Sequence, residues 1–334
     1  MEEAVSIIGA GSWGTTLGVI LAKKGLRVSL HSVFNEENLI MQKRRENPFF
    51  LKGIKFPSNL SVDTSLKEVL ENKFVVIAIP VKFIRKILRR IKKNGVSFKE
   101  KLFVSVAKGI EVGSLKTPSQ IIKEELDKVK VAVLSGPTIA KEVIKGVPTT
   151  CVIASEDRKV AKILQNIFTT PRFRVYTHSD VVGVELGGAL KNIIAIACGI
   201  ADGLGFGTNT KAALVTRGLV EIIRLGKRLG TSPSTFMGIG GLGDLVTTCF
   251  SSYSRNRFVG EQVGKGKSLR EVLSKMKMVA EGVETVKSAY QLSKKAGVEM
   301  PITKEVFCVL YRNKSPLEAV KDLMERPLKS EKVS

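Results

Sequence analysis

The sequence predicts an α/β N-terminal domain with a mostly parallel sheet, followed by a mostly α-helical C-terminal domain. Over the first half of the chain, short apolar runs of strand length alternate with helical stretches. From about Ser179 these runs fade, and apolar residues at helical spacing continue to the end. A length of 334 residues suits two domains, each with its own core. We therefore expect a first domain over residues 1–178 and a second over 179–334.

The composition is that of a soluble globular protein, with 43% hydrophobic and 25% charged residues. No apolar run reaches the roughly 20 residues of a membrane span, and the acidic N-terminus does not resemble a signal peptide. The four cysteines are far apart and form no CxxC pair, which favours a reducing compartment, the cytoplasm. With only two histidines, no metal site is expected.

The net charge of +23 raises the question of a nucleic-acid partner. The charges are mostly dispersed, however, and the densest run, Arg85–Lys93, alternates with apolar residues at helical spacing. We interpret that run as the solvated face of an amphipathic helix, and we expect no nucleic-acid partner. A positive field would attract small anionic substrates.

A glycine pattern follows the first apolar run. Residues 4–8 form a short strand pattern, and Gly9, Gly11 and Gly14 complete a GxGxxG sequence before a helical run and a second strand over 26–30. In this context the pattern predicts a dinucleotide-binding, Rossmann-type domain. Gly9 permits the tight turn, Gly11 lets the backbone approach a pyrophosphate, and Gly14 allows close helix–strand packing. N–H groups near Ser12 and Trp13 would face the phosphates. The alternative is a purely structural glycine turn.

The position that contacts the adenosine ribose should lie about 20 residues further on, at the end of the second strand. That position holds His31, Ser32 and Val33, with neither an acid for NAD nor an arginine for NADP. Glu36 and Glu37 come slightly late, and the basic run at 43–45 comes later still. The cofactor choice stays open, with a slight preference for NADPH.

Three further buried strands are expected over 73–80, 102–107 and 129–134, with two more near 149–154 and 174–177. Lys108 follows one of these strands, and the segment Ser135–Thr138 follows another. Ligands bind beyond the carboxyl ends of parallel strands, so we expect both to face the cofactor crevice.

The stretch from Val182 to Asn209 should be mostly a buried helix, and it contains one full charge, Lys191. Its neighbours one turn away, such as Gly187 and Ile194, can neither pair with nor hydrate an ammonium group. Desolvation would lower the lysine pKa toward the range used in proton transfer. The alternative is a lysine that extends from the helix edge to solvent.

Three later segments are candidates for a second part of the site. Gly238–Gly243 is expected to be a mobile or tightly turned loop, followed by Asp244. Ser251–Arg257 combines hydroxyls, an amide and guanidinium groups that could hold a phosphate or carboxylate, or could be only a polar loop. Glu281 opens a helix, where an acid could also serve only the helix dipole.

Taken together, these segments resemble the soluble bacterial-type NAD(P)-dependent glycerol-3-phosphate dehydrogenases. The matching pieces run in family order over nearly the whole chain. They are GAGSWGT at Gly9–Thr15, VAKGIE at Val106–Glu111, LSGPTIAKEV at Leu134–Val143, the stretch Glu185–Leu214, GLGDLVTTC at Gly241–Cys249, SRNR at Ser254–Arg257 and VAEGV at Val279–Val283.

The resemblance implies reversible reduction of dihydroxyacetone phosphate to sn-glycerol 3-phosphate, a supply reaction for phospholipids in the cytoplasm. It implies Lys191 as the proton donor or acceptor on the C2 oxygen. The substrate residues it implies are Lys108, Gly136, Thr138, Lys191, Asp244, Ser254, Arg255 and Asn256. The cofactor residues are Gly9, Gly11, Ser12, Trp13, Gly14, Val33, Lys108, Ala140, Arg255, Val279 and Glu281. A homodimer is expected by analogy.

The chemistry of the residues agrees, because a carbonyl that takes a hydride develops negative charge that a nearby ammonium stabilises and then protonates. We expect Lys108 and Lys191 to lower each other's pKa and Asp244 to hold Lys191. Two alternatives stay open. One is a related two-domain dehydrogenase for another hydroxy acid or sugar. The other is a cofactor-sensing or nucleic-acid-binding protein without catalysis.

Overall fold

The computed structural model describes residues 4–93, 95, 97–276, 278–328 and 330–331. The chain divides into two compact units, and each is described by itself. Unit 1 comprises Met1–Ala107 and Pro118–Val181, and unit 2 comprises Lys108–Thr117 and Val182–Ser334. The sequence placed a single boundary after residue 178. The chain instead passes to unit 2 at Lys108, returns at Pro118 and leaves unit 1 again after Val181.

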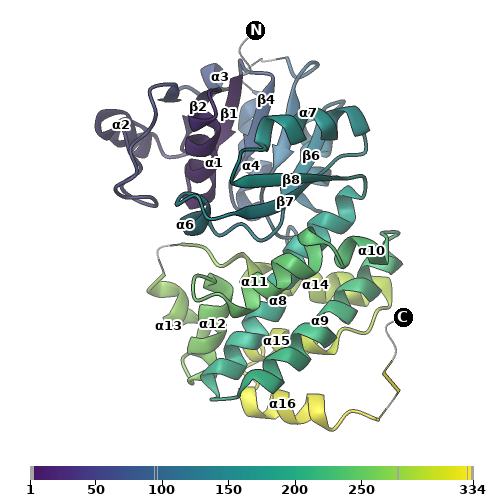
Figure 1. Ribbon diagram of the computed structural model, residues 1–334. Coiled ribbons are helices and arrows are strands. Elements are labelled where there is room, and N and C mark those ends of the chain that lie inside the picture. Colours follow the sequence, from purple (N-terminus) through teal and green to yellow (C-terminus); the bar gives the residue numbers. More distant parts are fainter. Residues whose placement is uncertain (1–3, 94, 96, 277, 329, 332–334) are drawn as a thin grey trace. The chain divides into compact units, whose positions relative to one another are not determined.

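An eight-stranded sheet forms the centre of unit 1 (Figure 1). Its strand order is β3-β2-β1-β4-β5-β6-β7-β8, and every pairing is parallel except that of β6 with β7. The strands are β1 (Ala4–Ile8), β2 (Arg27–His31), β3 (Leu60–Val62), β4 (Phe74–Ile77), β5 (Leu102–Ser105), β6 (Lys130–Ser135), β7 (Thr149–Ala154) and β8 (Phe173–His178). The predicted mostly parallel α/β sheet is confirmed.

The sheet reverses its order beside β1. The chain first builds β2 and β3 on one side of β1, and then β4, β5 and β6 on the other. Loops that leave the carboxyl ends of β1 and β4 therefore diverge, and this switch point is where ligands bind in open parallel sheets. The glycine loop at Gly9–Gly14 starts at this point.

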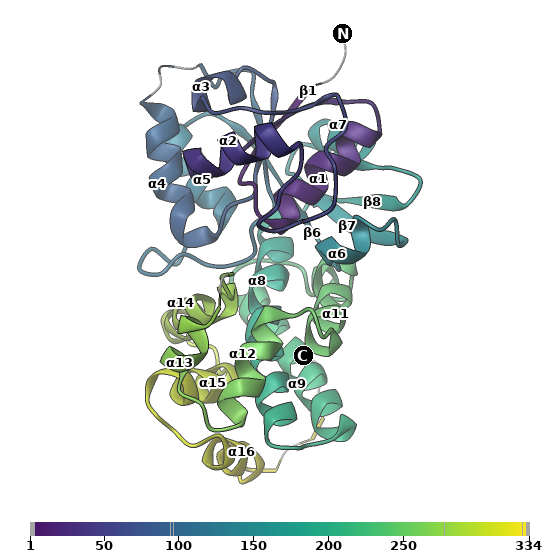
Figure 2. The same cartoon turned by 90° about the vertical axis from the view of Figure 1, so that its left-hand side faces the viewer.

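Helices cover both faces of the sheet in unit 1 (Figures 1 and 2). The expected amphipathic helix is α4 (Val81–Lys92), which buries Val81, Ile84, Leu88 and Ile91 and leaves its basic side chains outward. This confirms the interpretation of the basic run. The other helices are α1 (Ser12–Lys23), α2 (Asn35–Arg44), α3 (Leu66–Val69), α5 (Pro118–Leu126), α6 (Ala140–Val143) and α7 (Arg158–Phe168).

Unit 2 is helical in the part that the structure describes, as the sequence predicts. Its helices are α8 (Val181–Gly203, of which Val181 belongs to unit 1), α9 (Thr208–Arg228), α10 (Pro233–Phe236), η1 (Ile239–Gly243), α11 (Asp244–Phe250), α12 (Arg255–Gly264), α13 (Leu269–Ser274), α14 (Glu281–Ala296), α15 (Pro301–Tyr311) and α16 (Pro316–Met324). By length and composition α8 alone among the described helices could cross a membrane. Within that helix, however, 94% of the apolar window is buried in the protein, as in the core helix of a soluble protein.

Glycines let α8 and α12 pack backbone against backbone. A Cβ on Gly199 would lie 2.0 Å from the carbonyl oxygen of Arg257, and one on Gly260 would lie 2.0 Å from that of Ile196. Neither contact can be relieved by a side-chain movement, because both partners are backbone atoms. This close crossing fixes α8, the helix that contains Lys191, against the rest of unit 2.

A buried carboxylate joins α9 to α15. Glu221 is 2% exposed, and its oxygens accept hydrogen bonds from the backbone N–H groups of Ile302 and Thr303 at 2.6 and 3.1 Å. These N–H groups belong to the first turn of α15, where no helical partner exists for them. Burial raises the pKa of Glu221 from 4.5 to about 7, although these hydrogen bonds oppose the rise.

The raised pKa of Glu221 predicts a pH-dependent stability. The folded protein binds one more proton than the unfolded chain between pH 4.5 and about 7, so this contribution to stability is full below pH 4.5 and lost as the pH rises to 7. The loss is roughly 3 kcal/mol at 1.36 kcal/mol per pKa unit. Thermal denaturation of wild type and Glu221→Gln from pH 4.5 to 8 should show their difference in Tm changing over this window. A constant difference would contradict the prediction.

Candidate active site

Two lysines share one buried carboxylate in unit 2. The Lys191 ammonium donates to Oδ1 of Asp244 at 2.5 Å, and the Lys108 ammonium donates to Oδ2 of the same side chain at 2.7 Å. Asp244 is 1% exposed, Lys191 is 5% exposed and Lys108 is partly buried. A carboxylate between two ammonium groups leaves a local excess of positive charge, which suits an anionic ligand.

Burial lowers the pKa of Lys191 to about 8. The loss of solvation is the largest cause, the charge of Lys108 adds to it, and the charge and hydrogen bond of Asp244 oppose it. The expectation of a desolvated lysine with a lowered pKa is confirmed. The alternative of a lysine extended to solvent is wrong, because the ammonium is paired inside the protein. At neutral pH the group is still protonated and can give up its proton.

Three separate segments position this cluster. Lys191 lies in the middle of α8, Lys108 begins the short excursion Lys108–Thr117, and Asp244 is the first residue of α11. The glycines before Asp244 were expected to form a mobile or tightly turned loop, and the structure has a tight helical turn there. They form the π-helical turn η1, in which a Cβ on Gly241 would lie 2.2 Å from the carbonyl oxygen of Phe236. Glycine is needed at Gly241 for this close approach, and the turn leads directly into Asp244.

Sequence reasoning missed two residues of this cluster. The Lys191 ammonium also donates to Oγ1 of Thr248 at 2.5 Å, and that hydroxyl donates to the Asp244 carbonyl oxygen at 2.7 Å. Asn192 donates to the carbonyl oxygen of Lys108 at 3.4 Å. Thr248 lies four residues after Asp244, which is one helical turn, so that spacing was a usable signal. No sequence spacing points to Asn192 and Lys108.

The Ser254–Asn256 segment begins α12. Ser254 is the N-cap, and its hydroxyl accepts from the N–H of Arg257 at 3.2 Å. Asn256 is buried, and its Oδ1 accepts from the N–H of Gly282 at 3.0 Å. Arg255 is exposed and donates to the carbonyl oxygen of Val279 at 2.7 Å. From Ser254 the segment is therefore an ordered helix start, whereas residues 251–253 lie in the turn before it.

Glu281 connects this region to the lysine cluster. It is the first residue of α14, as predicted, and its carboxylate accepts from the backbone N–H of Lys108 at 3.4 Å. The acid therefore does more than complement the helix dipole. These contacts link the predicted site residues of unit 2 through α8, α11, α12 and α14. The residues are Lys108, Lys191, Asp244, Ser254, Arg255, Asn256, Val279 and Glu281.

Three glycines shape the loop that leads from β1 into α1 in unit 1. Gly9 has a φ of +116°, and a Cβ there would lie 2.4 Å from the carbonyl oxygen of Ala78. A Cβ on Gly14 would lie 1.9 Å from the carbonyl oxygen of Gly9, so α1 can approach the loop only with glycine there. A Cβ on Gly11 would meet nothing within 4 Å. The backbone is therefore open at Gly11, where a pyrophosphate could approach the N-terminus of α1.

Asn47 holds the glycine loop, and sequence reasoning missed it. Its side chain is fully buried and donates to the carbonyl oxygen of Ala10 at 2.7 Å and to Oγ1 of Thr15 at 2.8 Å. Its own oxygen accepts from the N–H groups of Phe49 and Phe50, each at 3.1 Å. In the sequence, an asparagine after a helix predicts only a turn, so no pattern indicated that Asn47 holds the glycine loop.

The remaining predicted residues of unit 1 follow the carboxyl ends of its strands. Val33 follows β2, and Ser12 and Trp13 begin α1 directly after the glycine turn. Gly136, with a φ of +135°, follows β6, and its carbonyl oxygen accepts from the Thr138 hydroxyl at 3.1 Å. Ala140 begins α6. All of them lie in the loops or first helical turns that follow the strands, where ligands bind in this class of sheet.

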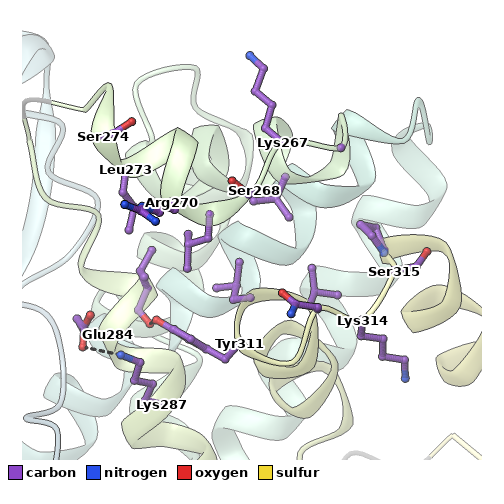
Figure 3. A pocket seen from close by; sticks show the side chains of 18 residues that line it. Lys267, Ser268, Arg270, Leu273, Ser274, Glu284, Lys287, Tyr311, Lys314 and Ser315 are labelled. Carbon is purple, nitrogen blue, oxygen red and sulfur yellow. Dashed lines mark hydrogen bonds and ion pairs between the residues drawn. The ribbon is translucent and has the colours of Figure 1, made fainter.

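A hollow of about 970 Å³ in unit 2 contains none of the predicted site residues (Figure 3). Two of its lysines pair with carboxylates. Lys287 lies 3.4 Å from Glu284, and Lys314 pairs with Glu305 and Asp322. The hollow lacks a buried pair of titratable groups like that at Lys191, so the lysine cluster remains the candidate for chemistry.

Two family models match the chain. One is described as the NAD-dependent glycerol-3-phosphate dehydrogenase N-terminus and matches residues 4–161. The other is described as the C-terminus of the same enzyme and matches residues 180–321. Together they cover most of both units.

Individual proteins agree with the family models. The chain is 51% identical over 338 residues to a glycerol-3-phosphate dehydrogenase [NAD(P)+] of Citrifermentans bemidjiense, with 100% of both chains covered. It is 48% identical to a protein of the same name from a Thermoanaerobacter species, with 98% of each covered. The fold is similar to the crystal structure of a glycerol-3-phosphate dehydrogenase from Coxiella burnetii, with a TM-score of 0.93, 37% identity, and 97% and 99% of the two chains covered.

Proposed function

The chain belongs to the NAD-dependent glycerol-3-phosphate dehydrogenase family, and on that premise we propose that Lys191 and Lys108 serve the NAD(P)H-dependent reduction of dihydroxyacetone phosphate. The product is sn-glycerol 3-phosphate, and the reaction is reversible. The observation that carries the mechanism is the sharing of Asp244 by Lys191 and Lys108. When bound, the nicotinamide supplies or accepts the hydride at C2 of the substrate.

Lys191 is the proton donor and acceptor in this proposal. During reduction the C2 oxygen gains negative charge, and an ammonium beside it both stabilises that charge and donates a proton to the oxygen. A pKa of about 8 keeps Lys191 protonated at pH 7 while making its proton easier to transfer than that of a solvated lysine. In the reverse direction the neutral amine takes the proton from the C2 hydroxyl.

Asp244 and Lys108 act on Lys191. Asp244 fixes the direction of the Lys191 ammonium and keeps it charged, because an opposite charge raises a lysine pKa. Lys108 supplies a second positive charge that attracts the phosphate substrate and favours release of the proton from Lys191. The other substrate residues we propose are Gly136, Thr138, Ser254, Arg255 and Asn256.

Arg255→Ala should weaken phosphate binding. Its guanidinium lies at the start of α12, donates one hydrogen bond to the carbonyl oxygen of Val279 and interacts with the charge of Glu281, and its remaining donors can bind a phosphate. Loss of a charged hydrogen bond of this kind predicts a KM for dihydroxyacetone phosphate raised about tenfold or more, with kcat changed less. Steady-state kinetics with varied substrate test this. Arg270→Ala, an exposed arginine elsewhere in unit 2, is the control. An unchanged KM in Arg255→Ala would refute the role.

The cofactor is proposed to bind through Gly9, Gly11, Ser12, Trp13, Gly14, Val33 and Ala140 of unit 1 and Lys108, Arg255, Val279 and Glu281 of unit 2. The fit rests on the open backbone at Gly11 and on the backbone contacts that Gly9 and Gly14 make. NAD(P) is the cofactor of the family, and its two forms differ only in a phosphate on the adenosine ribose.

Two alanine substitutions distinguish glycines that the fold of the loop requires from glycines that cofactor binding requires. Gly14→Ala forces a Cβ against the Gly9 carbonyl oxygen, so Tm should fall by several degrees and cofactor affinity with it. Gly11→Ala meets no atom within 4 Å, so Tm should stay at the wild-type value while cofactor affinity falls about tenfold. Differential scanning fluorimetry with and without NADH measures both. Equal Tm for the two variants would contradict the assignment of these glycines.

We further propose that the protein acts in the cytoplasm, supplies the glycerol phosphate backbone of phospholipids, and forms a homodimer. Cys151, Cys198, Cys249 and Cys308 form no disulfide in the part of the chain that the structure describes, as in a reducing compartment. The homodimer rests on analogy with helix-rich second domains, and size-exclusion chromatography with light scattering tests it.

The deciding assay mixes purified protein with dihydroxyacetone phosphate and follows nicotinamide absorbance, once with NADH and once with NADPH. Rapid loss of absorbance with either supports the proposed reaction. No loss, in protein that binds the cofactor, would refute the substrate assignment and direct the search to other carbonyl acids with an anionic group.

A further inference from the structure

An acid, Glu37, lies beside the end of β2, although its position in the sequence is later than the spacing of a ribose-binding acid predicts. The carboxylate of Glu37, in the first turn of α2, accepts a hydrogen bond from the Ser32 hydroxyl. Ser32 is buried and directly follows β2. A position at the end of the second strand of a dinucleotide-binding unit contacts the adenosine ribose, and an acid there binds the two hydroxyls of NAD.

The contact is held by a second pair of hydrogen bonds. The N–H of Ser32 donates to Oδ1 of Asn38 at 2.7 Å, and the Asn38 amide donates back to the Ser32 carbonyl oxygen at 2.8 Å. Asn38 is fully buried, so the first turn of α2 is fixed against the end of β2. Among the residues that the structure describes, Ser32 is the one hydrogen-bond partner of the Glu37 carboxylate, so its second oxygen can accept from a ligand.

The basic run at 43–45, which could bind a 2′-phosphate, is placed elsewhere. The Arg45 guanidinium donates to the carbonyl oxygens of Leu60 and Pro57 at 2.8 and 2.6 Å. Lys43 and Arg44 lie in the last turn of α2, about 10 Å along the helix from Glu37 at 1.5 Å per residue. Burial lowers the pKa of His31, so its ring is neutral at pH 7.

We propose that Glu37, positioned by Ser32, selects NADH over NADPH in this protein. The carboxylate would accept hydrogen bonds from the ribose hydroxyls of NAD, whereas the 2′-phosphate of NADP would place negative charge against it. This inference rests on the proposed function, since it assumes that the glycine loop binds a nicotinamide dinucleotide. It reverses the slight preference for NADPH that the sequence suggested.

Trp13 offers a direct measure of binding that does not depend on activity. It is the single tryptophan of the chain and lies in the first turn of α1, next to the glycine loop. Quenching of its fluorescence by NADH and by NADPH, in protein without substrate, gives the two dissociation constants. Wild type should bind NADH at least about tenfold more tightly than NADPH. NADH gains a hydrogen bond from its ribose to the Glu37 carboxylate, and NADPH meets repulsion between its 2′-phosphate and that carboxylate.

Glu37→Gln should reduce this ratio about tenfold, chiefly through tighter NADPH binding. Glu36→Gln is the matched control, because it removes the same charge one residue away from an exposed side chain. Ser32→Ala keeps the charge of Glu37 and removes its anchor, so it should reduce the ratio by a smaller factor. Arg90→Ala removes a cation whose charge acts on His31, and it should leave the NADPH constant unchanged.

Three results would overturn the inference alone: tighter NADPH binding by wild type, equal effects of Glu37→Gln and Glu36→Gln, or a selective loss of NADPH in Arg90→Ala. The last would make Arg90 a phosphate ligand. Absence of quenching with both nucleotides, confirmed by calorimetry, would instead overturn the cofactor assignment and with it the proposed function.

Discussion

Lys191→Met should lower kcat by about 10⁴-fold, because one substitution removes both the proton donor and a positive charge beside the developing oxyanion. Methionine keeps the length of the side chain and is compatible with its buried surroundings. Asp244 would retain Lys108 as its partner, so the carboxylate is not left without a cation. The measurement is the rate of NADH oxidation at saturating dihydroxyacetone phosphate.

Cofactor binding is the internal control for this variant. Quenching of Trp13 fluorescence by NADH should match wild type, which would separate a loss of chemistry from a loss of fold. Lys265→Met removes a lysine that pairs with Glu261 on the surface of α12 and should leave kcat unchanged. A Lys191→Met enzyme with near wild-type kcat would remove Lys191 from the mechanism.

Asp244→Asn should lower activity about 100-fold at pH 7.5 and shift its pH dependence. The carboxylate counteracts both burial and the charge of Lys108, so its loss lowers the pKa of Lys191 below about 8. Reduction needs the protonated amine. In wild type the rate of reduction should therefore fall as the pH rises through about 8, and in Asp244→Asn the fall should begin at least about one pH unit lower.

The pH profile distinguishes this role from a purely structural one. If Asp244 acts by keeping Lys191 charged, the variant should recover part of its activity at pH 6, where the lysine regains its proton. A variant that is damaged only structurally would be equally impaired at all pH values, and that result would refute the electrostatic role. Asp322→Asn, which removes an exposed carboxylate paired with Lys314, should leave the profile unchanged.

The glycine loop could be predicted from the spacing of its glycines after a strand, and the burial of Lys191 from the apolar residues around it in the helix. A Cβ on Gly14 would meet the carbonyl oxygen of Gly9, five residues earlier, whereas the contact at Gly9 is with the distant Ala78 backbone. Lys191 is desolvated by the apolar helix that carries it. The strand β3, with three residues, is too short to give a periodic pattern and was missed.

The contacts among the charged groups could not be predicted from spacing. Asp244 lies 53 residues from Lys191 and 136 residues from Lys108, and only the packing of α8, α11 and the 108–117 segment brings them together. The family resemblance identified these three residues. That both lysines donate to the same carboxylate, one to each oxygen, could be seen only in the structure. The same is true of Glu37, whose place in sequence looked too late for the ribose. The fold of α2 against β2 corrects that offset.

The return of the chain at Pro118 has a consequence for how this protein can be divided. A fragment that begins at Val182 would contain Lys191 and Asp244 but would lack Lys108, and also Ile110, which is part of the helical core. The hydroxyl of Ser288 donates to the Ile110 carbonyl oxygen at 3.0 Å and would lose its acceptor. The helical half is therefore not an independent module that a single gene fusion or a single proteolytic cut could transfer intact. Any exchange of this half between relatives has to carry ten residues from within the other half along with it.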